Sequence, residues 1–597
     1  MQIKRKDIYI ISLSFCLLIT SGLNIWLLIS SIPLGYIIQV PPELETLVVG
    51  TRSGPHDLDP TDSWDSASNN VIEQVAETLF TYDTRQFVID ETMPRVNWLA
   101  TGYSWDPTDT ILTVNIKTGV RFHDGTLMDA AAVAWNFNRF MYLMNHTGEL
   151  PSDGRAVRVH SLYEFPDGIP IFESVVASDA DTVVFTLTAP YAPILDAMCY
   201  ISCGILSPAS TPATQIIHLS TGDIIGTGPY MYDYYITDTE VRFTKFDDYW
   251  ATDAPYNLED EVMFDAMVYS VIDDPTALNY AMLIGDIDIL FGAMADLLPA
   301  FRANPWIKVY DAPKPGLVYQ YLSFNVNNVN LTWRKAMSYA INYTYIIEEM
   351  LEGRAHRAYG AISPGYGAGF NHWLRDANRV IDPTNGSAVY NLTTARSIIL
   401  TDLTGDSRID PRLQANDTIE DPLWLNADLV SFNYSYNTDN WFRADSYVVL
   451  KDWFDDIGID LIDAGTDWAY FILYGWWWDY ESTDLYILGW SPDHMDPFNM
   501  LDPLFSNISV SNYSFVNDPW VMGNLSLALE TTDDAARNQI YWDIQWRLFA
   551  ELYVHAPIYH SFITSVHGAN LYDVEYDVMG RWWALPVKRN ITWVPEI

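Results

Sequence analysis

The ten residues 488–497, LGWSPDHMDP, hold the side chains best suited to binding a charged small molecule. In a closed, desolvated cleft the carboxylate of Asp493 would make a strong charge-assisted contact with an ammonium group. Trp490 could add aromatic surface and attract the same cation to its ring face. The alternative is structural, with Asp493 as a turn residue before Pro497 and Trp490 in the core. The residues alone favour the structural interpretation.

The chain carries none of the short motifs that point to a common enzyme chemistry. It has no H-E-x-x-H, no G-x-S-x-G and no cysteine-rich metal motif. The glycine-rich stretch 362–370, ISPGYGAGF, lacks the Lys-Ser/Thr that completes a phosphate-binding loop. Pairs of carboxylates that mimic a glycosidase site arise by chance in so acidic a chain. We therefore expect a protein that is not an enzyme and that uses no cofactor and no metal ion.

Cys199 and Cys203 are the two cysteines outside the N-terminal hydrophobic segment, and they lie four residues apart. In an oxidising exterior they could form a disulfide if the local backbone permits it. They could equally remain two small buried thiols. Without a nearby histidine they make a poor zinc site.

Regular elements must position the candidate residues, and the best-defined elements lie in the first quarter of the chain. Val114 and Ile116 alternate with polar residues, as in a half-buried strand. Asp124-Gly125 is a turn dipeptide, because glycine tolerates a positive φ. Asp129 can cap a helix over 130–140. The pattern predicts a strand, a turn and a helix in that order.

The exact amino-acid sequence of this stretch is more specific than its hydrophobic periodicity. Residues 116–140, IKTGVRFHDGTLMDAAAVAWNFNRF, closely resemble the signature of the family 5 extracellular solute-binding proteins, the peptide and nickel receptors of ABC importers. Further landmarks of that family occur in order from about residue 47 to residue 559, nearly the whole exported part: Leu58-Asp59-Pro60, Glu77-Thr78-Leu79-Phe80, Gly226-Thr227-Gly228-Pro229-Tyr230, Tyr249-Trp250, Gly285-Asp286-Ile287-Asp288, Arg334 to Asn342, and Ala556 to Tyr559. Around these landmarks we expect a strand at 47–50 and helices at about 69–81, 333–347 and 535–550.

The resemblance implies an α/β, bilobal periplasmic-binding-protein-like fold of type 2, with a hinge and an extra subdomain in the first lobe. Residues 1–42 would form an N-terminal membrane anchor or signal segment and a spacer. Lobe 1 would hold residues 43–318, with the extra subdomain at about 83–225, and lobe 2 would hold 319–550. The last segment, 551–597, would return to lobe 1.

The resemblance also implies where a ligand binds. In peptide-binding members the same G-W-x-x-D-x-x-D-P spacing occurs, and its first aspartate grips the α-ammonium group of the peptide; that position is Asp493 here. The backbone of Gly489, Trp490 and Ser491 would pair with an extended ligand as an added strand. The opposite wall would come from Ser53, Gly54 and Pro55, with His56 as a loop donor. Arg443 lies where dipeptide-binding members carry a carboxylate-binding arginine, although that alignment needs an insertion.

We therefore expect the substrate-binding receptor of an ABC importer, which captures oligopeptides and delivers them to a permease. The permease is implied by the resemblance and by no residue of this chain. The alternative ligand is an oligosaccharide, because residues 474–480, YGWWWDY, are unusually aromatic and could stack on sugars. The same aromatic residues would also suit a core strand or a contact between lobes. A surface sensory or structural protein with this fold is the alternative from a different class.

The formal charge of −45 and the isoelectric point near 4.3 limit the possible partners. Nucleic acid is excluded as a partner because phosphate binding needs basic patches. An anionic membrane surface is disfavoured for the same reason. The acidic residues occur along the whole mature chain, which favours solubility in a demanding exterior over the attraction of cationic ligands.

Residues 8–32 carry no charged side chain and follow Lys4-Arg5-Lys6. This length exceeds the ~20 residues of a membrane helix, and the basic flank places the N-terminus in the cytoplasm. We expect an uncleaved anchor over a cleaved signal, with the remainder on the extracellular side of the membrane. Several of the many N-x-S/T sequons should then be glycosylated: Asn145, Asn330, Asn342, Asn385, Asn391, Asn416, Asn433, Asn507, Asn512, Asn524 and Asn590.

Overall fold

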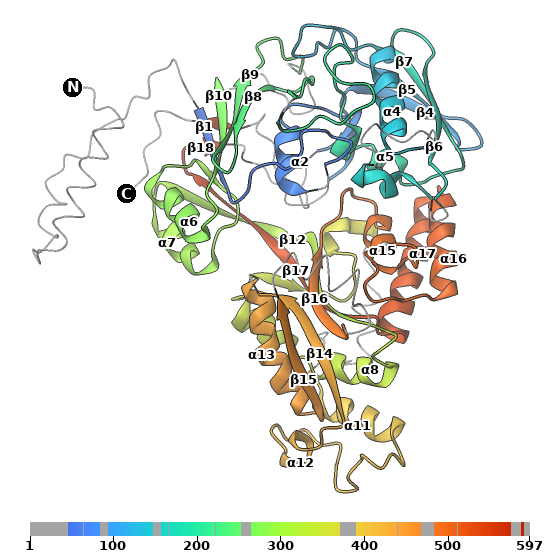
Figure 1. Ribbon diagram of the computed structural model, residues 1–597, viewed down its shortest axis with the longest axis vertical. Coiled ribbons are helices and arrows are strands. Elements are labelled where there is room, and N and C mark those ends of the chain that lie inside the picture. Colours follow the sequence, from blue (N-terminus) through green and yellow to red (C-terminus); the bar gives the residue numbers. More distant parts are fainter. Residues whose placement is uncertain are drawn as a thin grey trace, which may run out of the picture.

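The computed structural model describes residues 46–589, apart from several segments between them. The segments outside the description are 84–92, 147–156, 252–263, 370–389, 467–482 and 575–586, together with 64, 166–167, 221, 439, 510 and 573. The described elements form an upper half and a lower half (Figure 1). Among the described residues, no helix combines the length and the apolar character that crossing a bilayer requires.

One eleven-stranded sheet runs through both halves, in the order β15-β14-β16-β12-β17-β11-β1-β10-β9-β8, with β13 also paired to β17. The long antiparallel strands β12 and β17 belong to both halves (Figure 1). The strands of this sheet are β1 (Thr46–Thr51), β8 (Tyr230–Ile236), β9 (Glu240–Lys245), β10 (Ala266–Val271), β11 (Ile289–Leu290), β12 (Ile307–Phe324), β13 (Ala355–Arg357), β14 (Val430–Asn437), β15 (Ile459–Thr466), β16 (Leu485–Trp490) and β17 (His555–Gly568).

The carboxyl ends of the strands in the two halves face each other along β17. Through β11, the end of β1 at Gly50 is level with Val566 of β17. Through β12, the end of β16 at Trp490 is level with His560 of β17. The two strands approach from opposite directions, and the six residue steps between these levels span about 20 Å. The loops that follow β1 and β16 therefore enter the space between the halves.

The upper half also contains a separate four-stranded sheet of order β4-β5-β7-β6 and a two-stranded sheet of β2 and β3. Helix α4 covers β6 and β7 and buries most of its apolar residues against them. These elements are β2 (Phe80–Tyr82), β3 (Arg95–Asn97), β4 (Ala100–Trp105), β5 (Ile111–Ile116), β6 (Phe172–Ala177), β7 (Thr182–Leu187), α2 (Ser66–Ile72), α4 (Ala130–Leu143), α5 (Ile194–Ala197), α6 (Pro275–Ile284) and α7 (Leu298–Ala303). Strands β18 (Leu571–Tyr572) and β19 (Lys588–Arg589) pair near the end of the chain.

Helices surround the lower part of the sheet, and most begin at a side-chain cap. Asn440 caps α13 through Arg443 N, and Asp518 caps α16 through Trp520 N and Val521 N. The lower helices are α8 (Leu331–Ala340), α9 (Tyr343–Tyr345), α11 (Leu392–Asp402), α12 (Pro422–Leu425), α13 (Trp441–Asp455), α15 (Phe498–Phe505), α16 (Pro519–Glu530) and α17 (Asp534–Trp546). Helices α15, α16 and α17 lie together below the four-stranded sheet (Figure 1).

Several predicted elements are confirmed. The strand at 47–50 is β1, and the helix over 130–140 is α4, with the Asp129 carboxylate accepting from Ala132 N at 2.8 Å. Gly125 has φ 83°, as the predicted turn requires. The helix over 535–550 is α17, which continues as a single π-helical turn over Arg547–Glu551.

Two predicted helices are shorter than expected. The helix predicted at 69–81 ends at Ile72, because Phe80 and Tyr82 pair with β3 and form a strand instead. The helix predicted at 333–347 is interrupted at Ile341, which has an extended backbone with ψ 124°. Asn342 then caps α9 by accepting from Tyr345 N, so the chain starts a new helix there.

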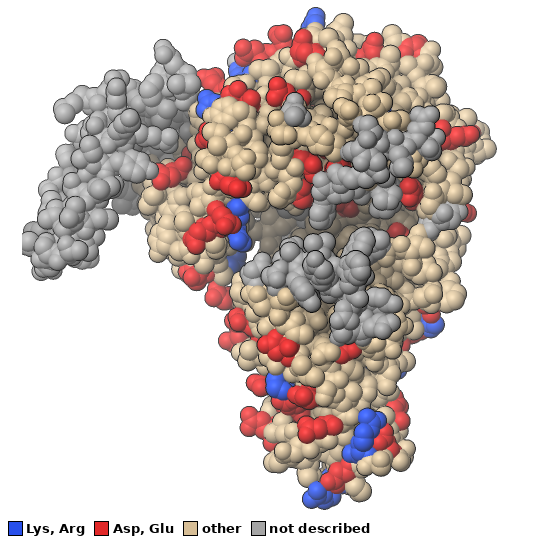
Figure 2. All heavy atoms as spheres, viewed as in Figure 1, with Lys and Arg blue, Asp and Glu red and all other residues tan. Residues whose placement is uncertain are grey.

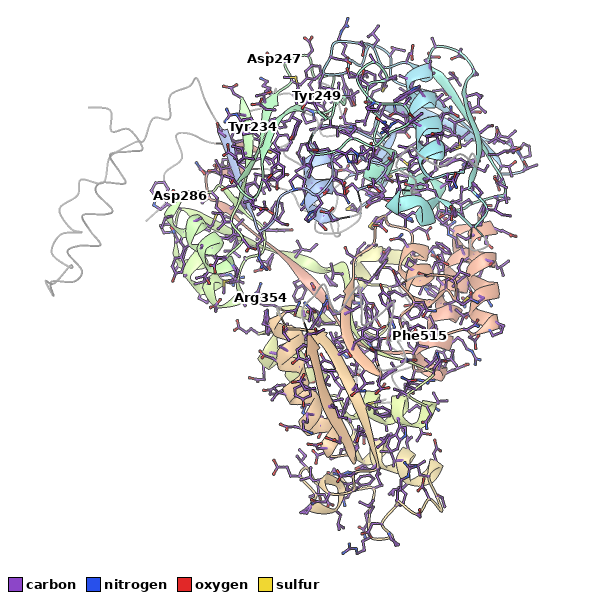
Figure 3. All side chains as sticks on the ribbon, viewed as in Figure 1. Tyr234, Asp247, Tyr249, Asp286, Arg354 and Phe515 are labelled. Atoms are coloured by element: carbon purple, nitrogen blue, oxygen red, sulfur yellow. The ribbon has the colours of Figure 1, made fainter. Side chains whose placement is uncertain are left out.

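Three of the family-like landmarks converge on one buried carboxylate. Glu77 accepts hydrogen bonds from Trp98 Nε1 at 2.7 Å, Thr227 Oγ1 at 2.7 Å, Tyr249 OH at 2.7 Å and Trp250 Nε1 at 2.8 Å. Figure 3 labels Tyr249 in the upper half. Burial raises the pKa of Glu77, while these four donors act in the opposite direction. The landmarks thus hold the upper half together.

The landmark glycines allow two chain segments to approach closely. A Cβ on Gly226 would collide with the Val75 carbonyl oxygen, and one on Gly228 would lie 2.7 Å from the Gln74 carbonyl oxygen. His123 of the signature segment bonds to the same strand entry, through its backbone to Gly226 O at 3.0 Å and through Nε2 to Gly228 O at 2.9 Å. The signature segment therefore packs inside the upper half.

Candidate functional site

The candidate site centres on residues 491–497, hereafter the Asp493 loop, which connects β16 to α15. Ser491 is exposed, Asp493 is half-buried, and His494 and Asp496 are buried. Gly489 lies opposite Gln320 in the β12–β16 ladder, and a Cβ at this position would collide with the Gln320 side-chain amide. The structure thus places Gly489, Trp490, Ser491 and Asp493 together at the carboxyl end of β16.

Asn499 in the first turn of α15 fixes the geometry around Asp493. Its Oδ1 accepts from Asp493 N at 2.7 Å, and its Nδ2 donates to Asp493 Oδ2 at 3.3 Å. Its carbonyl oxygen accepts from Trp490 Nε1 at 3.1 Å, which orients the indole ring. Asn499 is 3% exposed. The side-chain amide of Asn499 therefore holds the Asp493 carboxylate, and its main-chain carbonyl holds the Trp490 ring. Both predicted ligand contacts depend on this one residue.

The second aspartate of the loop has a different role. Asp496 is buried, and its Oδ1 accepts from Phe498 N at 2.8 Å and from Tyr541 OH at 2.7 Å. Arg537 Nη2 lies 3.4 Å from Asp496 Oδ2. Burial raises the pKa of Asp496, while Arg537 acts in the opposite direction. Asp496 is thus tied to the lower half, where it anchors the far end of the loop.

The upper half contacts this loop through Tyr82. Its hydroxyl accepts a hydrogen bond from Met495 N at 3.0 Å and donates one to Asp196 Oδ1 at 3.0 Å. Arg95 Nη1 donates to Asp196 Oδ2 at 2.6 Å. Burial lowers the pKa of Arg95, but the Asp196 carboxylate together with smaller effects of Cys199, Tyr82 and Tyr103 outweighs burial, so the pKa of Arg95 is raised. The loop is therefore held from both halves.

Tyr366 places a hydroxyl close to the same carboxylates. It follows the turn at Ser363, whose hydroxyl bonds to Gly316 O in β12 at 2.8 Å. Among the described residues the buried Tyr366 hydroxyl has no hydrogen-bond partner. Burial first, and then the negative charges of Asp496, Asp493 and Asp196, raise the pKa of Tyr366 well above its usual value. This hydroxyl is able to bond to a group that enters the site.

The loop after β1 lies across the space from the Asp493 loop. Ser53 is exposed, whereas Gly54 and Pro55 are buried. Gly54 packs against the Tyr235 ring, and a Cβ there would collide with this ring. His56 N donates to Ser68 Oγ at 2.9 Å. The close approach at Gly54 is therefore made to a side chain of the upper half, and contact of Ser53, Gly54 or Pro55 with a ligand stays a prediction.

Arg443 lies in the first turn of α13, at the same edge of the sheet, because β14 runs parallel to β16 and also ends there. Its Nη1 donates to Asn437 Oδ1 at 2.5 Å, and the residue is 8% exposed. Its charge also acts on the Tyr321 and Tyr559 hydroxyls of the crossing strands. Arg443 lies at the right edge for a ligand carboxylate, but its contact with a ligand stays a prediction.

The surface between the halves is hollowed, and acidic side chains are spread over the whole visible face (Figure 2). This spread agrees with the expectation that the net charge serves solubility. Among the residues that the structure describes, no group of three or more His, Cys, Asp or Glu could hold a metal ion. Cys199 and Cys203 are both buried, and no disulfide joins them in the structure. The aromatic stretch Tyr474–Tyr480 lies outside the described residues.

A two-lobed α/β fold in which facing strand ends direct loops into the space between the halves is typical of receptors that close over a solute. The chain belongs to the bacterial extracellular solute-binding proteins, family 5, whose family model for the middle region matches residues 95–512. The expected type of fold is confirmed, and so is the expectation of a binding protein of ABC transport rather than an enzyme.

Individual relatives support the same assignment. The glutathione-binding protein GsiB of Pectobacterium atrosepticum is 23% identical over 535 residues, which are 88% of this chain and 91% of that protein. Helicobacter pylori DppA, solved with the peptide STSA, aligns with a TM-score of 0.69 and 20% identity over 91% of this chain and 98% of its own. Staphylococcus aureus NikA, solved with Ni(L-His)2, gives a TM-score of 0.66 and 14% identity over 92% and 100%.

The sequence did not indicate the residues that support the Asp493 loop. Tyr82 is separated from Met495 by 413 positions, and Tyr366 and Asp196 are also distant from the loop in sequence. Asn499 is the exception, because Pro497 favours the start of a helix at this position. An asparagine in the first turn of a helix can form a hydrogen bond with the loop that precedes the helix.

Proposed function

We propose that this protein is the extracellular receptor of an ABC importer that captures oligopeptides by their α-ammonium group and delivers them to a permease. The observation that carries the proposal is the Asp493 carboxylate, which Asn499 holds in the loop that follows β16. A carboxylate with its geometry fixed before binding makes a charge-assisted bond to an ammonium with little loss of entropy.

The charged groups around Asp493 support an amine ligand over an anionic one. Asp196 and Asp496 act on the Tyr366 hydroxyl together with Asp493, so three carboxylates share one region. Two of them are paired with guanidinium groups, Asp196 with Arg95 and Asp496 with Arg537. The Asp493 carboxylate accepts a hydrogen bond from the Asn499 side-chain amide. A region that gathers three carboxylates suits a positively charged ligand end better than an anionic one.

The backbone at the end of β16 would supply the remaining contacts. Gly489 and Trp490 pair with β12 on one side, and Ser491 continues as exposed chain. An extended peptide that bonds to this backbone would be recognised by its main chain, with tolerance for its side chains. Arg443 would reach the peptide carboxylate only if the ligand is short.

The N-terminal segment would hold this receptor at the cell surface. The uncharged residues 8–32 behind Lys4-Arg5-Lys6 support an anchor with the folded part outside the membrane. Exposed sequons such as Asn330 and Asn507 would then be accessible for glycosylation, whereas Asn512 is 7% exposed and its Nδ2 donates to Ser506 O and Val516 O. Intact mass of the native protein tests the modification.

A thermal-shift screen tests the ligand class. The full chain is heated with a pool of free peptides, the same peptides N-acetylated, an oligosaccharide pool, and nickel(II) with histidine. Only the free peptides should raise the melting temperature, because a ligand that binds the folded state alone stabilises it. A shift with oligosaccharides or nickel alone would contradict peptide capture, and no shift at all would favour the sensory or structural alternative.

A further inference from the structure

A chain of hydrogen bonds runs from the upper half to the Asp493 loop. It starts at Arg95, passes through the Asp196 carboxylate and the Tyr82 hydroxyl, and ends at the backbone N–H of Met495. The last bond joins residues 413 positions apart, and Met495 is only two residues after Asp493. The position of the predicted ligand anchor thus depends on a side chain of the opposite half.

The upper-half members of this chain are held rigidly. Tyr82 and Arg95 face each other in the β2–β3 ladder, and Asp196 lies in α5. Tyr82 is 4% exposed, so packing fixes its ring. The Arg95 and Asp196 side chains are 28% and 17% exposed. Because the hydroxyl is fixed by the upper half, it can bond to Met495 only when the two halves are together.

The direction of the bonds gives Tyr82 its specific role. A tyrosine hydroxyl has one proton to donate, and Tyr82 donates it in the hydrogen bond to Asp196. The hydroxyl oxygen therefore acts as the acceptor for Met495 N–H. A carboxylate that accepts this hydrogen bond polarises the hydroxyl, and the hydroxyl oxygen becomes a stronger acceptor. Phenylalanine would fill the same space but would leave the Met495 N–H and one Asp196 oxygen without this partner.

Other bonds between the halves do not involve the loop. Ala192 N donates to Leu529 O at 2.8 Å, and Thr532 Oγ1 donates to Asp109 Oδ2 at 3.0 Å. These contacts join the upper half to the end of α16 and the residues that follow it. They hold the halves together without bonding to the Asp493 loop, so they can be used to separate the effect of general closure from that of support of the loop.

We propose that Tyr82 is a positioning residue that sets the Asp493 loop in its ligand-gripping geometry as the halves close, so that closure and the amine contact are coupled. The proposal rests on the proposed function, in which Asp493 holds the α-ammonium group. Asn499 and Asp496 support the loop within the lower half, and Tyr82 adds support from across the interface.

The experiment compares the full-length protein with Tyr82→Phe and two matched controls, by calorimetry and stopped-flow with a peptide from the screen. Tyr163→Phe removes another buried hydroxyl, which donates a hydrogen bond to Ala197 O of α5. Among the described residues, no hydrogen bond of this hydroxyl reaches the Asp493 loop. Thr532→Val removes a bond between the halves that is remote from the loop. Tyr82→Phe should weaken peptide binding about tenfold, chiefly through faster dissociation, and each control less than about twofold.

A double-mutant cycle shows whether Tyr82 acts through Asp493. In an Asp493→Asn background the effect of Tyr82→Phe should disappear, because the contact that it positions is already lost. Additive effects, or an unchanged affinity in Tyr82→Phe, would overturn the proposal. Failure of the proposed function would appear differently, as an unchanged affinity in Asp493→Asn alone. If Tyr82→Phe folds poorly, Arg95→Gln removes the bond that holds Asp196 against Tyr82 while it makes the region more negative, so weaker peptide binding would still report the chain of bonds and unchanged or stronger binding would overturn it.

Discussion

Two aspartates three residues apart illustrate how far residue types determine a role. Asp496 accepts from a backbone amide and from Tyr541 and lies beside Arg537, so its environment within the lower half is complete. Asp493 is supported by Asn499 and is nearer to the surface. The spacing of the two residues indicated a ligand-binding loop. It could not predict Tyr82 or Tyr541 as partners, because only the fold places these distant residues beside the loop.

Asp502 in α15 should make stability depend on pH. Burial raises its pKa to about 7, against a smaller opposite effect of Ser506, and the raised value exceeds the ~4 of an unfolded aspartate. The folded state therefore holds this proton more tightly, so the contribution to stability is complete below about pH 4 and is lost as the pH rises to about 7.

Replacing Asp502 with Asn removes this titration. The variant should gain free energy of unfolding relative to the native protein, by an amount that grows between about pH 4 and pH 7, is constant above that, and is at most about 4 kcal/mol. Denaturant unfolding at a series of pH values measures the gain. A gain that is the same at every pH would contradict a raised pKa.

At the scale of helices and strands, local sequence patterns correctly predicted those helices and turns whose boundaries depend on residues next to them in the sequence. The Asp129 cap and the Gly125 turn follow from residues next to them in sequence. The helix predicted at 69–81 was too long because residues 80–82 pair with β3, a contact that local periodicity does not reveal. The landmarks identified the family, but only the fold shows that Glu77 gathers them around one carboxylate.

Removing the cap of α4 should destabilise the upper half without affecting ligand binding. Asp129→Ala deletes the acceptor for Ala132 N and should cost about 1 kcal/mol, while Asp129→Asn keeps an acceptor and should cost much less. Denaturant midpoints of the two variants measure the difference, and peptide affinity should be unchanged in both. Equal midpoints for Ala and Asn would show that the cap contributes nothing.

At the scale of the whole molecule, the halves are joined where the β12–β17 ladder is irregular. Its register shifts between Asp311 and Pro315 and again between Pro315 and Tyr319. Figure 3 shows Arg354 beside this crossing, where its carbonyl accepts from Phe562 N. An interrupted ladder bends more easily than a regular one, so we expect closure to occur here. The lobe boundaries at 318 and 550 stay predictions.

The net charge should make stability depend on salt. With 77 acidic and 32 basic residues, the folded chain repels itself, and compaction brings these charges closer together. Raising sodium chloride from about 10 mM to about 1 M shortens the screening length from roughly 30 Å to roughly 3 Å. The melting temperature should therefore rise across this range, and equally in potassium chloride. A constant or falling melting temperature would contradict strong self-repulsion.

The most direct test of peptide capture is calorimetry of Asp493→Asn with a peptide that has a free N-terminus and with its N-acetylated form. The control is Asp460→Asn, the same change of charge at an aspartate on β15 that pairs with Lys451. Asp493→Asn should weaken binding of the free peptide by about a hundredfold or more and bring it close to that of the acetylated form, while the control binds like the native protein. Native affinity for the free peptide in Asp493→Asn would contradict the account.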